Sequence, residues 1–473
     1  MKTFNFLSLS LVLVLSSGCV PKVEKASPVP ESRIDGELDA LSAEFSDGTL
    51  EREWWKRYHD AQLDSILGEA LASAPAIQTV RARYAQAGAL IESVEAYNLP
   101  HVSANTSLVK ERFSANHIFP KTFLGGSTNT EYQAGISLDY DFDFWDKRKS
   151  RILSAKEQAM AQMASIEASK VALSTAIVQT YLSWNYDERQ RDVLRSIEQT
   201  ASEELSITDK RRRLGLSDAT ATYRAKAVLA SIGERIAAVD KKIEGEKESI
   251  CVLGGFLPSY AQTLKKPDIA EASPLPLPKE VMLHLLSHRP DVAVAKHTAL
   301  SKSHTIEEAK ARFYPDISLS GLIGFISFDW AKFLDHSSYQ PSGGIAASLP
   351  LLDWGEREAV LNGSVGDYNA SVYEYNQAVI SAANEVVVVL KQSHIVQSQV
   401  QIHARQMEAK RSETAIAQHK YKLALVNKLP YLAARRNEYE TLGEAIDLER
   451  DQSLLQVSLI RSLGGGYRQK DPK

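Results

Sequence analysis

The stretch YQAGISLDYDFDF at residues 132–144 alternates apolar side chains with small or polar ones. A period of two is typical of a β-strand with one apolar and one polar face. Strands of an outer-membrane barrel need this pattern, with apolar side chains toward lipid and polar side chains toward the lumen. We therefore predict a membrane-spanning strand whose lumen-facing acidic residues are Asp139, Asp141 and Asp143, which would give the lumen of such a barrel a mild preference for cations. An equal alternative is that some of these aspartates simply bond to neighbouring strands.

Three further stretches read as strands. They are residues 102–108 (Val102, Ala104, Thr106, Leu108), 317–325 (Ile317 to Phe325) and 345–351 (Ile345, Ala347, Leu349, Leu351). Four strands cannot close a barrel, and an open sheet edge in lipid would leave backbone groups without hydrogen bonds. Three chains would supply twelve strands, enough to enclose a lumen. A four-stranded sheet of a soluble domain remains the alternative.

Two very long helices are expected after the strand pairs, because residues 146–214 and 367–429 contain neither glycine nor proline. At about 1.5 Å per residue, each could reach roughly 90–100 Å. Apolar residues recur at spacings of three and four, which is typical of a coiled-coil seam. The seam residues are Leu173, Ile177, Tyr181 and Trp184 in the first run, and Val379, Ala383, Val386 and Leu390 in the second.

The two halves of the chain resemble each other, so we predict an internal repeat. An offset of 209 residues links Trp145 to Trp354 and Leu214 to Leu423. Each half reads helix, strand, loop, strand, very long helix, helix. We place repeat 1 at residues 54–260, a linker at 261–278, repeat 2 at 279–466 and a C-terminal tail at 467–473. The predicted fold class is mainly α with membrane β.

The N-terminus reads as an export signal at residues 1–18, with Lys2 before a short apolar stretch that is too short to span a bilayer. Ser16, Ser17 and Gly18 precede Cys19, which resembles a bacterial lipoprotein box. It departs from that pattern in having Ser16 where leucine is usual. The resemblance implies cleavage before Cys19, an N-palmitoyl and S-diacylglycerol lipid on that residue, and a lipidated tether over residues 19–53. Val20, rather than aspartate, implies the outer membrane. An ordinary signal peptide is the alternative.

Composition limits the remaining classes of function. The net charge is −4, which excludes a basic protein that binds nucleic acid. Only two cysteines are present, so no disulfide framework is expected. No apolar run of 18 residues follows the signal, so no transmembrane helix is predicted.

Several motifs together resemble the TolC-type outer-membrane efflux proteins, in the NodT-like lipoprotein branch that serves resistance-nodulation-division (RND) multidrug pumps. They are WWKRYHDAQLDSILGEALASAP at 54–75, AYNLP at 96–100, DFDFWDKR at 141–148, LPLLDWGER at 349–357, HKYKLALVNKLPYL at 419–432 and SLGGGYRQ at 462–469. The resemblance implies a homotrimer with a twelve-stranded β-barrel in the outer membrane and a twelve-helix periplasmic α-barrel. Short equatorial helices are implied near 59–73 and 279–288. The implied function is passive conduction of drugs or other small toxic molecules from an RND pump and a periplasmic adaptor protein, with no enzymatic activity.

The resemblance also implies a gate at the turns that join the long helices, near 214–218 and 423–430. The family's gate-holding tyrosine and neighbouring basic residue match Tyr421 and Lys420, and the apolar aperture falls on Leu429. Their acceptors are expected among acidic or backbone groups around Arg213 to Asp218. Relatives often carry an aspartate four residues after the aperture leucine, where this chain has Ala433. Asp218 is the candidate replacement for that acidic constriction. A solvated helix end is the alternative for Tyr421 and Lys420.

The sequence gives little support for a catalytic or metal-binding site. His284 and His288 share a helical face but lack a recognisable third ligand, so a structural pair is favoured. No cofactor is predicted, and the sequence assigns no role to Cys251. Two other functions stay open: a similar duct for a polypeptide secretion system, and a periplasmic coiled-coil structural lipoprotein.

Overall fold

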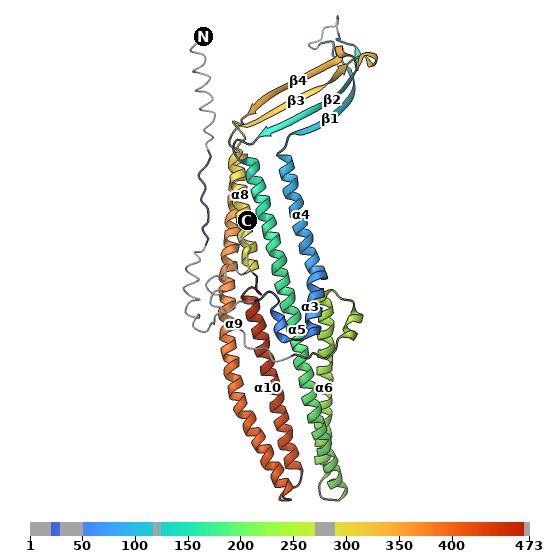
Figure 1. Ribbon diagram of the computed structural model, residues 1–473, viewed down its shortest axis with the longest axis vertical. Helices are drawn as coiled ribbons and strands as arrows, with labels where there is room; N and C mark the ends of the chain where they lie inside the picture. Colours follow the sequence, from blue (N-terminus) through green and yellow to red (C-terminus); the bar gives the residue numbers. More distant parts are fainter. Residues whose placement is uncertain (1–19, 29–50, 117–121, 123, 270–288, 468–473) are drawn as a thin grey trace. The chain divides into compact units, whose positions relative to one another are not determined.

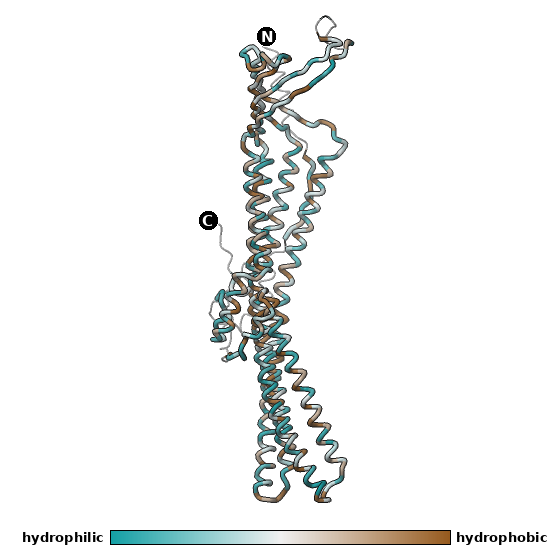
Figure 2. The backbone as a smooth tube through the Cα atoms, turned by 90° about the vertical axis from the view of Figure 1, so that its right-hand side faces the viewer, coloured by the Kyte–Doolittle hydropathy of each residue, from teal (hydrophilic) through white to brown (hydrophobic). Residues whose placement is uncertain are grey.

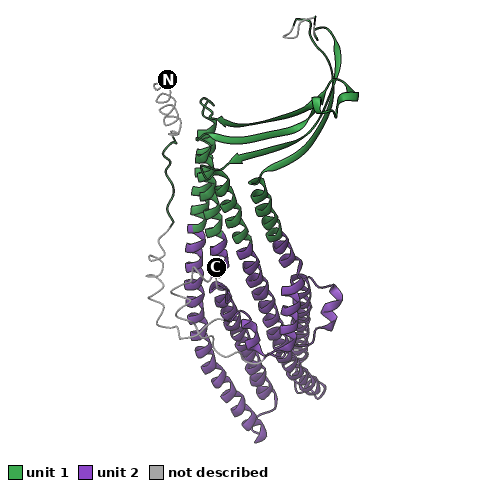
Figure 3. Ribbon diagram, turned by 45° about the horizontal axis from the view of Figure 1, so that its top comes forward, with its two compact units in different colours: residues 1–28, 83–162, 295–375 green, residues 29–82, 163–294, 376–473 purple. Residues whose placement is uncertain are grey.

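The computed structural model describes residues 20–28, 51–116, 122, 124–269 and 289–467. The predicted signal peptide, Cys19, His284 and His288 lie outside these residues, as do most of the tether, part of the linker and most of the tail. The chain divides into two compact units (Figure 3). Unit 1 takes the described parts of residues 1–28, 83–162 and 295–375. Unit 2 takes those of 29–82, 163–294 and 376–473.

Unit 1 contains a four-stranded antiparallel sheet in the order β1-β2-β3-β4 (Figure 1). Its strands are β1 (His101–Arg112), β2 (Thr128–Phe142), β3 (Asp316–Ser327) and β4 (Tyr339–Ser348). Strands β1 and β4 form the two edges. The four predicted strands are therefore present. Two of their ends are corrected: Asp143 and Phe144 lie beyond β2, and Leu349 and Leu351 lie beyond β4, which ends two residues before Pro350.

The structure describes seven α-helices, most of them long. The chain forms α3 (Ala61–Ser73), α4 (Pro75–Tyr97), α5 (Lys147–Arg213), α6 (Ala219–Gly254), α8 (Pro290–Ala311), α9 (Glu356–Lys422) and α10 (Leu429–Ser462), with short 3-10 turns between some of them. The element order α4-β1-β2-α5-α6 recurs as α8-β3-β4-α9-α10, as predicted from the repeat. Helix α3 is the short helix expected near 59–73. Hydrophobic and hydrophilic residues alternate along the long helices (Figure 2).

Helix α9 begins eleven residues before the predicted start at 367, and it includes Gly363 and Gly366. A glycine inside a helix costs only about 1 kcal/mol relative to alanine, so packing overrides it. By length and composition alone, one stretch of α9 is long and apolar enough to cross a membrane. A packed core helix passes the same test. Of the predicted second seam, Val379, Val386 and Leu390 are buried and Ala383 is half-buried. Only 28% of the apolar window is buried, so helix packing accounts for part of its apolar character. The absence of a transmembrane helix stays a prediction.

Unit 2 has its largest apolar core around α5. The predicted seam residues Leu173, Ile177, Tyr181 and Trp184 are all buried there. Asp60 connects this core to α3: its carboxylate accepts the Gln62 and Leu63 amides at 2.8 and 3.0 Å and the Tyr181 hydroxyl at 2.8 Å. Burial, followed by the hydrogen bond to Asp60, raises the pKa of the Tyr181 hydroxyl. Asp60 thus serves as the helix N-cap and as a buried acceptor.

The repeat is also visible in the backbone. Asp146 and Gly355, 209 positions apart, both have positive φ angles, of 54° and 88°, where a strand pair gives way to a long helix. Gly215 and Ala424 are related by the same offset and have φ angles of 71° and 57°. Each of these two ends a long helix with a left-handed residue, which lets the chain reverse. The two halves therefore use the same turn geometry.

Candidate channel wall and helical tips

The sheet of unit 1 has one apolar and one polar face, set by its register. Ile136 pairs with Ala104 on one side and Ile323 on the other. The same face carries Val102, Leu108 and Ile345. These three side chains and that of Ile323 are more than half exposed, at 60–72%. A contiguous exposed apolar face is unusual for a protein surface in water. It is the arrangement expected of a face that meets lipid.

The opposite face is more polar: β1 and β2 supply hydrogen-bonding groups to it, although Leu322 and Ile326 of β3 also lie there. Ser103 and Ser137 lie 2.7 Å apart through their hydroxyls, and Asn105 donates to Ser137 at 3.1 Å. Asp139 lies on this face, opposite His101 and Ser320, and Asp141 lies opposite Ser318. The register therefore puts Asp139 and Asp141 on the polar face, as the alternation predicts.

The third aspartate, Asp143, accepts hydrogen bonds from the start of α5 instead of lying on the sheet. Asp143 follows the end of β2, and its carboxylate accepts the Arg148 and Lys149 amides at 3.0 and 2.9 Å at the start of α5. Its prediction as a strand residue is therefore wrong, because a free helix N-terminus competes for the carboxylate. Asp141 in turn forms an ion pair with Arg148. Of the predicted acidic lining, Asp139 and Asp141 remain on the sheet.

The helical tips in unit 2 are two tight turns with the same hydrogen bonds. At the first, the Leu216 amide donates to the Arg211 carbonyl at 2.8 Å; at the second, the Leu425 amide donates to the Lys420 carbonyl at 3.0 Å. Both turns lie at the same end of unit 2 (Figure 1). Leucines project from them, with exposed fractions of 73% for Leu214 and 70% for Leu425. Each tip therefore presents an apolar surface to any partner.

The predicted gate residues gather at these tips. The Tyr421 ring lies parallel to that of Tyr431, with centroids 6.3 Å apart, and Lys428 Nζ lies 6.0 Å from the Tyr421 centroid. Leu429 is half-buried at the first position of α10, and its amide donates to Asn427 Oδ1 at 3.0 Å. Lys420 is exposed on the last turn of α9.

The side chains at the two ends of the region expected to hold the acceptors, Arg213 and Asp218, are engaged locally. Arg213 bonds to Asp209 at 2.8 Å, and Asp218 caps α6 by accepting the Ala221 amide at 3.2 Å. An ion pair between Lys428 and Glu203 of α5 joins the second turn to the first repeat. The roles of Tyr421 and Lys420 in a gate stay predictions.

Ion pairs join α10 to the helices of the first repeat. Besides Lys428–Glu203, Arg436 reaches Glu204 at 2.7 Å, and Arg235 contacts both oxygens of Glu440 at 2.8 and 3.0 Å. Bidentate arginine–carboxylate pairs fix geometry as well as adding energy. These pairs were not predicted from the sequence, because their members lie more than 200 residues apart. No short-range pattern marks them.

An acidic pair, the buried Asp187 of α5 and the half-buried Glu246 of α6, lies near Arg450 of α10. Desolvation, together with repulsion from Asp187, raises the pKa of Glu246 to about 8, while Lys242 and Arg450 oppose the shift. The pKa of Asp187 is raised as well, chiefly by burial. At neutral pH, Glu246 therefore keeps its proton in the folded chain and loses it in the unfolded chain.

Glu246→Gln is expected to remove a pH dependence of stability. Because the folded pKa is raised, the wild type loses stability as pH rises from about 4.5 to about 8. Glutamine mimics the protonated form, so the variant should be more stable by ~1–2 kcal/mol at pH 9, after discounting for solvent screening, and similar at pH 4. Melting temperatures across this range measure the effect. Glu244→Gln, an exposed change on the same helix, is the control. Parallel pH profiles for wild type and Glu246→Gln would refute the assignment.

Comparisons with known proteins agree with this architecture. The chain matches the outer membrane efflux protein family over residues 66–248 and 282–465, once in each repeat. The multidrug resistance outer membrane protein MdtP of Escherichia coli is 24% identical over 471 residues, covering 96% of this chain and 94% of that protein. The outer membrane protein VceC of Vibrio cholerae is 26% identical with a TM-score of 0.81, over 88% of this chain and 99% of VceC. The CmeC outer membrane channel of Campylobacter jejuni shares the fold, with a TM-score of 0.83 at 20% identity over 97% of this chain and 96% of CmeC.

A membrane sheet joined to paired long helices defines the class of outer-membrane channels. The chain belongs to the outer membrane efflux protein family. It acts in the outer membrane as an efflux channel, and its family is one of transport proteins rather than enzymes.

Proposed function

We propose that three copies of the chain form one outer-membrane exit duct. The observation that carries this proposal is the sheet, whose edge strands β1 and β4 each have one side without a partner strand in the described chain and whose apolar face is exposed. Lipid cannot satisfy the backbone groups of an open edge, so β4 of one copy must pair with β1 of the next. Twelve strands then close a barrel with the apolar face outside and the Asp139 face inside.

A second surface supports the same assembly. Apolar residues recur every seven or eight positions along the exposed side of α9, at Ile380, Val388, Ile395 and Ile402, and Ile416 follows two heptads later. Their exposed fractions are 44–61%. Heptad spacing is typical of a helix that packs against a neighbouring helix. The buried seam of α9 already faces its own unit. The exposed stripe therefore fits an adjacent copy, and the helices of three copies would form a periplasmic α-barrel.

An exit duct requires a pump that supplies its substrates and an adaptor protein that connects it to that pump. Drugs or other small toxic molecules are proposed to enter from an inner-membrane RND pump through a periplasmic adaptor, consistent with the multidrug resistance names of the relatives. Adaptor hairpins would dock at the tips, where Leu214 and Leu425 are exposed. Cys19, with its N-palmitoyl and S-diacylglycerol groups, would anchor each copy in the outer membrane.

Gating is proposed at the helical tips. Tyr421 stacks beside Tyr431 and under Lys428, which pairs with Glu203 of the first repeat. Breaking such contacts, worth about 1–3 kcal/mol each, would let the α9–α10 turn move away from α5 in an iris-like opening. An adaptor that binds the open form more tightly shifts the equilibrium toward it. Leu429 would line the aperture.

The α9 stripe gives the test of the assembly. Ile395→Glu combined with Ile402→Glu should convert a trimer into monomers, because charged side chains cannot be buried unpaired in an interface. Native mass spectrometry of the detergent-purified full chain measures the mass. Gln397→Glu with Gln401→Glu adds the same charge elsewhere on α9 and should leave the trimer intact. A wild type that is monomeric in several mild detergents would contradict the proposal.

A further inference from the structure

The segment that follows the predicted lipidation site lies along α8 and α9 of unit 1. Lys25 Nζ contacts Glu307 Oε1 at 3.2 Å, and the Ala26 amide donates to Asn369 Oδ1 at 2.8 Å. Val20 and Val23 pack against an apolar cluster that includes Ile306. These contacts fix residues 20–26 on the surface of the helices. One side of a cavity is thereby built from the tether itself.

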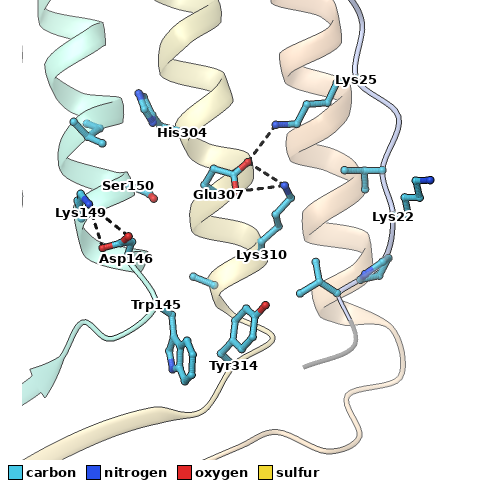
Figure 4. A pocket seen from close by; sticks show the side chains of 15 residues that line it. Lys22, Lys25, Trp145, Asp146, Lys149, Ser150, His304, Glu307, Lys310 and Tyr314 are labelled. Atoms are coloured by element: carbon cyan, nitrogen blue, oxygen red, sulfur yellow. Dashed lines mark hydrogen bonds and ion pairs between the residues drawn. The ribbon is translucent and has the colours of Figure 1, made fainter. Parts of the chain in front are cut away.

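The cavity has a volume of about 680 Å³ and is bordered by the tether, the start of α5 and the end of α8 (Figure 4). Its charged lining is mostly basic: Lys22, Lys25, Lys149, Lys310 and His304 against Asp146 and Glu307. Lys25 and Lys310 share the single carboxylate of Glu307, at 3.2 and 3.0 Å, and Lys149 pairs with Asp146 at 3.5 Å (Figure 4). Four lysines against two carboxylates leave a formal charge of +2 with neutral histidine. The cavity therefore favours an anion.

Two aromatic rings border the same cavity. Trp145 and Tyr314 are stacked, with centroids 4.7 Å apart, and Trp145 Nε1 donates to the Pro315 carbonyl at 2.8 Å. Trp145 lies just after β2 and Tyr314 just before β3, so both lie where the strands meet the helices. Tryptophan and tyrosine are enriched at the level of lipid headgroups, where one end of the ring system is apolar and the other is wet.

We propose that this cavity binds the phosphate headgroup of an anionic lipid. Basic pockets at the headgroup level are suited to such ligands, because each lysine attracts the phosphate across a short distance. The inference rests on the proposed placement of the strands in the outer membrane, which puts the strand ends at the lipid surface. Inorganic phosphate shares the recognised chemistry. The lipid is favoured because the tether that forms one wall is itself expected to begin with a membrane-anchored residue.

The test measures binding to the full-length detergent-purified protein by isothermal titration calorimetry. The probes are dihexanoyl phosphatidylglycerol, dihexanoyl phosphatidylcholine and inorganic phosphate, each below its micelle concentration where it has one. We expect saturable binding of phosphatidylglycerol, much weaker binding of phosphatidylcholine, and little affinity for phosphate. Lys149→Gln with Lys310→Gln should weaken phosphatidylglycerol binding by roughly tenfold or more. Lys296→Gln with Lys302→Gln, on α8 outside the cavity, should not.

Three outcomes would overturn the proposal: equal binding of both lipids, phosphatidylglycerol binding that is unchanged in the cavity variant, or inorganic phosphate that competes at equal affinity. The last would reassign the cavity to free phosphate. Melting temperature and particle mass confirm that each variant is folded and assembled. Channel conductance recorded on the same preparation separates the two proposals, since a conducting protein without lipid binding refutes only the lipid site.

Discussion

Tyr421→Ala combined with Lys420→Ala is expected to change small, rare channel openings into large and sustained ones. The Tyr421 ring supports both Tyr431 and Lys428, and Lys428 carries the ion pair to Glu203. Removing the ring frees the lysine from its place at the turn. A loss of about 2 kcal/mol from the closed state would raise the open-to-closed ratio by about thirtyfold. Single-channel recording in planar bilayers measures that ratio.

Two comparisons sharpen this test. Lys428→Ala alone should open the channel to a similar extent if the Glu203 ion pair is the main restraint. Lys410→Ala removes an exposed pair with Glu413 within α9 and should leave gating unchanged. If both tip variants open as rarely as the wild type, the contacts at the tips do not control gating. The proposed barrel would be unaffected by this result.

Among the substitutions considered for this chain, Arg289→Ala is expected to cause the largest loss in the free energy of unfolding. Arg289 is 8% exposed and holds three partners in unit 2: Asp291 at 2.7 and 3.0 Å, Glu385 of α9 at 2.8 Å, and the Ser462 carbonyl of α10 at 2.9 Å. Alanine would leave two carboxylates without their counter-charge. Breaking a fully buried pair costs about 3–5 kcal/mol, but the Asp291 and Glu385 side chains are 50% and 36% exposed and stay partly solvated, so we expect a loss of about 2–3 kcal/mol. Thermal unfolding of the purified protein measures the difference.

A conservative change and a surface change serve as controls. Arg289→Lys keeps the charge but loses the planar fork, so it should recover only part of the stability. Arg312→Ala removes an exposed contact to Glu308 at 3.5 Å and should cost at most about 1 kcal/mol. An Arg289→Ala protein as stable as Arg312→Ala would show that the buried network contributes little.

Regular patterns in the sequence predicted most of the fold, because they reflect local geometry. The alternation around Ile136 gave the sheet faces, and the spacing of Leu173, Ile177 and Trp184 gave the helix seam. The ends of elements were less predictable. Alternation runs on through Asp143 although the sheet stops at Phe142, since the start of α5 uses that carboxylate. Gly363 and Gly366 made the predicted start of α9 too late. Packing outweighs the small free-energy cost of a glycine inside a helix, so the helix includes both residues.

Side-chain pairs between distant segments could not be predicted. Lys428 and Glu203 are 225 positions apart, and Arg289 and Ser462 are 173 apart. Each pair depends on how long helices pack, and a charged residue on a helix surface looks the same in sequence whether it has a partner or faces water. The lysine-lined cavity was missed for the same reason, as it exists only when residues 20–25 lie against α8.

Thiol labelling of the sheet during conductance recording tests the central claim most directly. Asp139→Cys lies on the polar face, and Ile136→Cys lies three residues away on the apolar face, with Ile136 56% exposed. A bulky, charged, water-soluble thiol reagent should lower the single-channel conductance of Asp139→Cys and leave Ile136→Cys and the wild type unaffected. Equal sensitivity of the two cysteines, or no conductance from any of the proteins, would contradict a barrel whose polar face lines an aqueous duct.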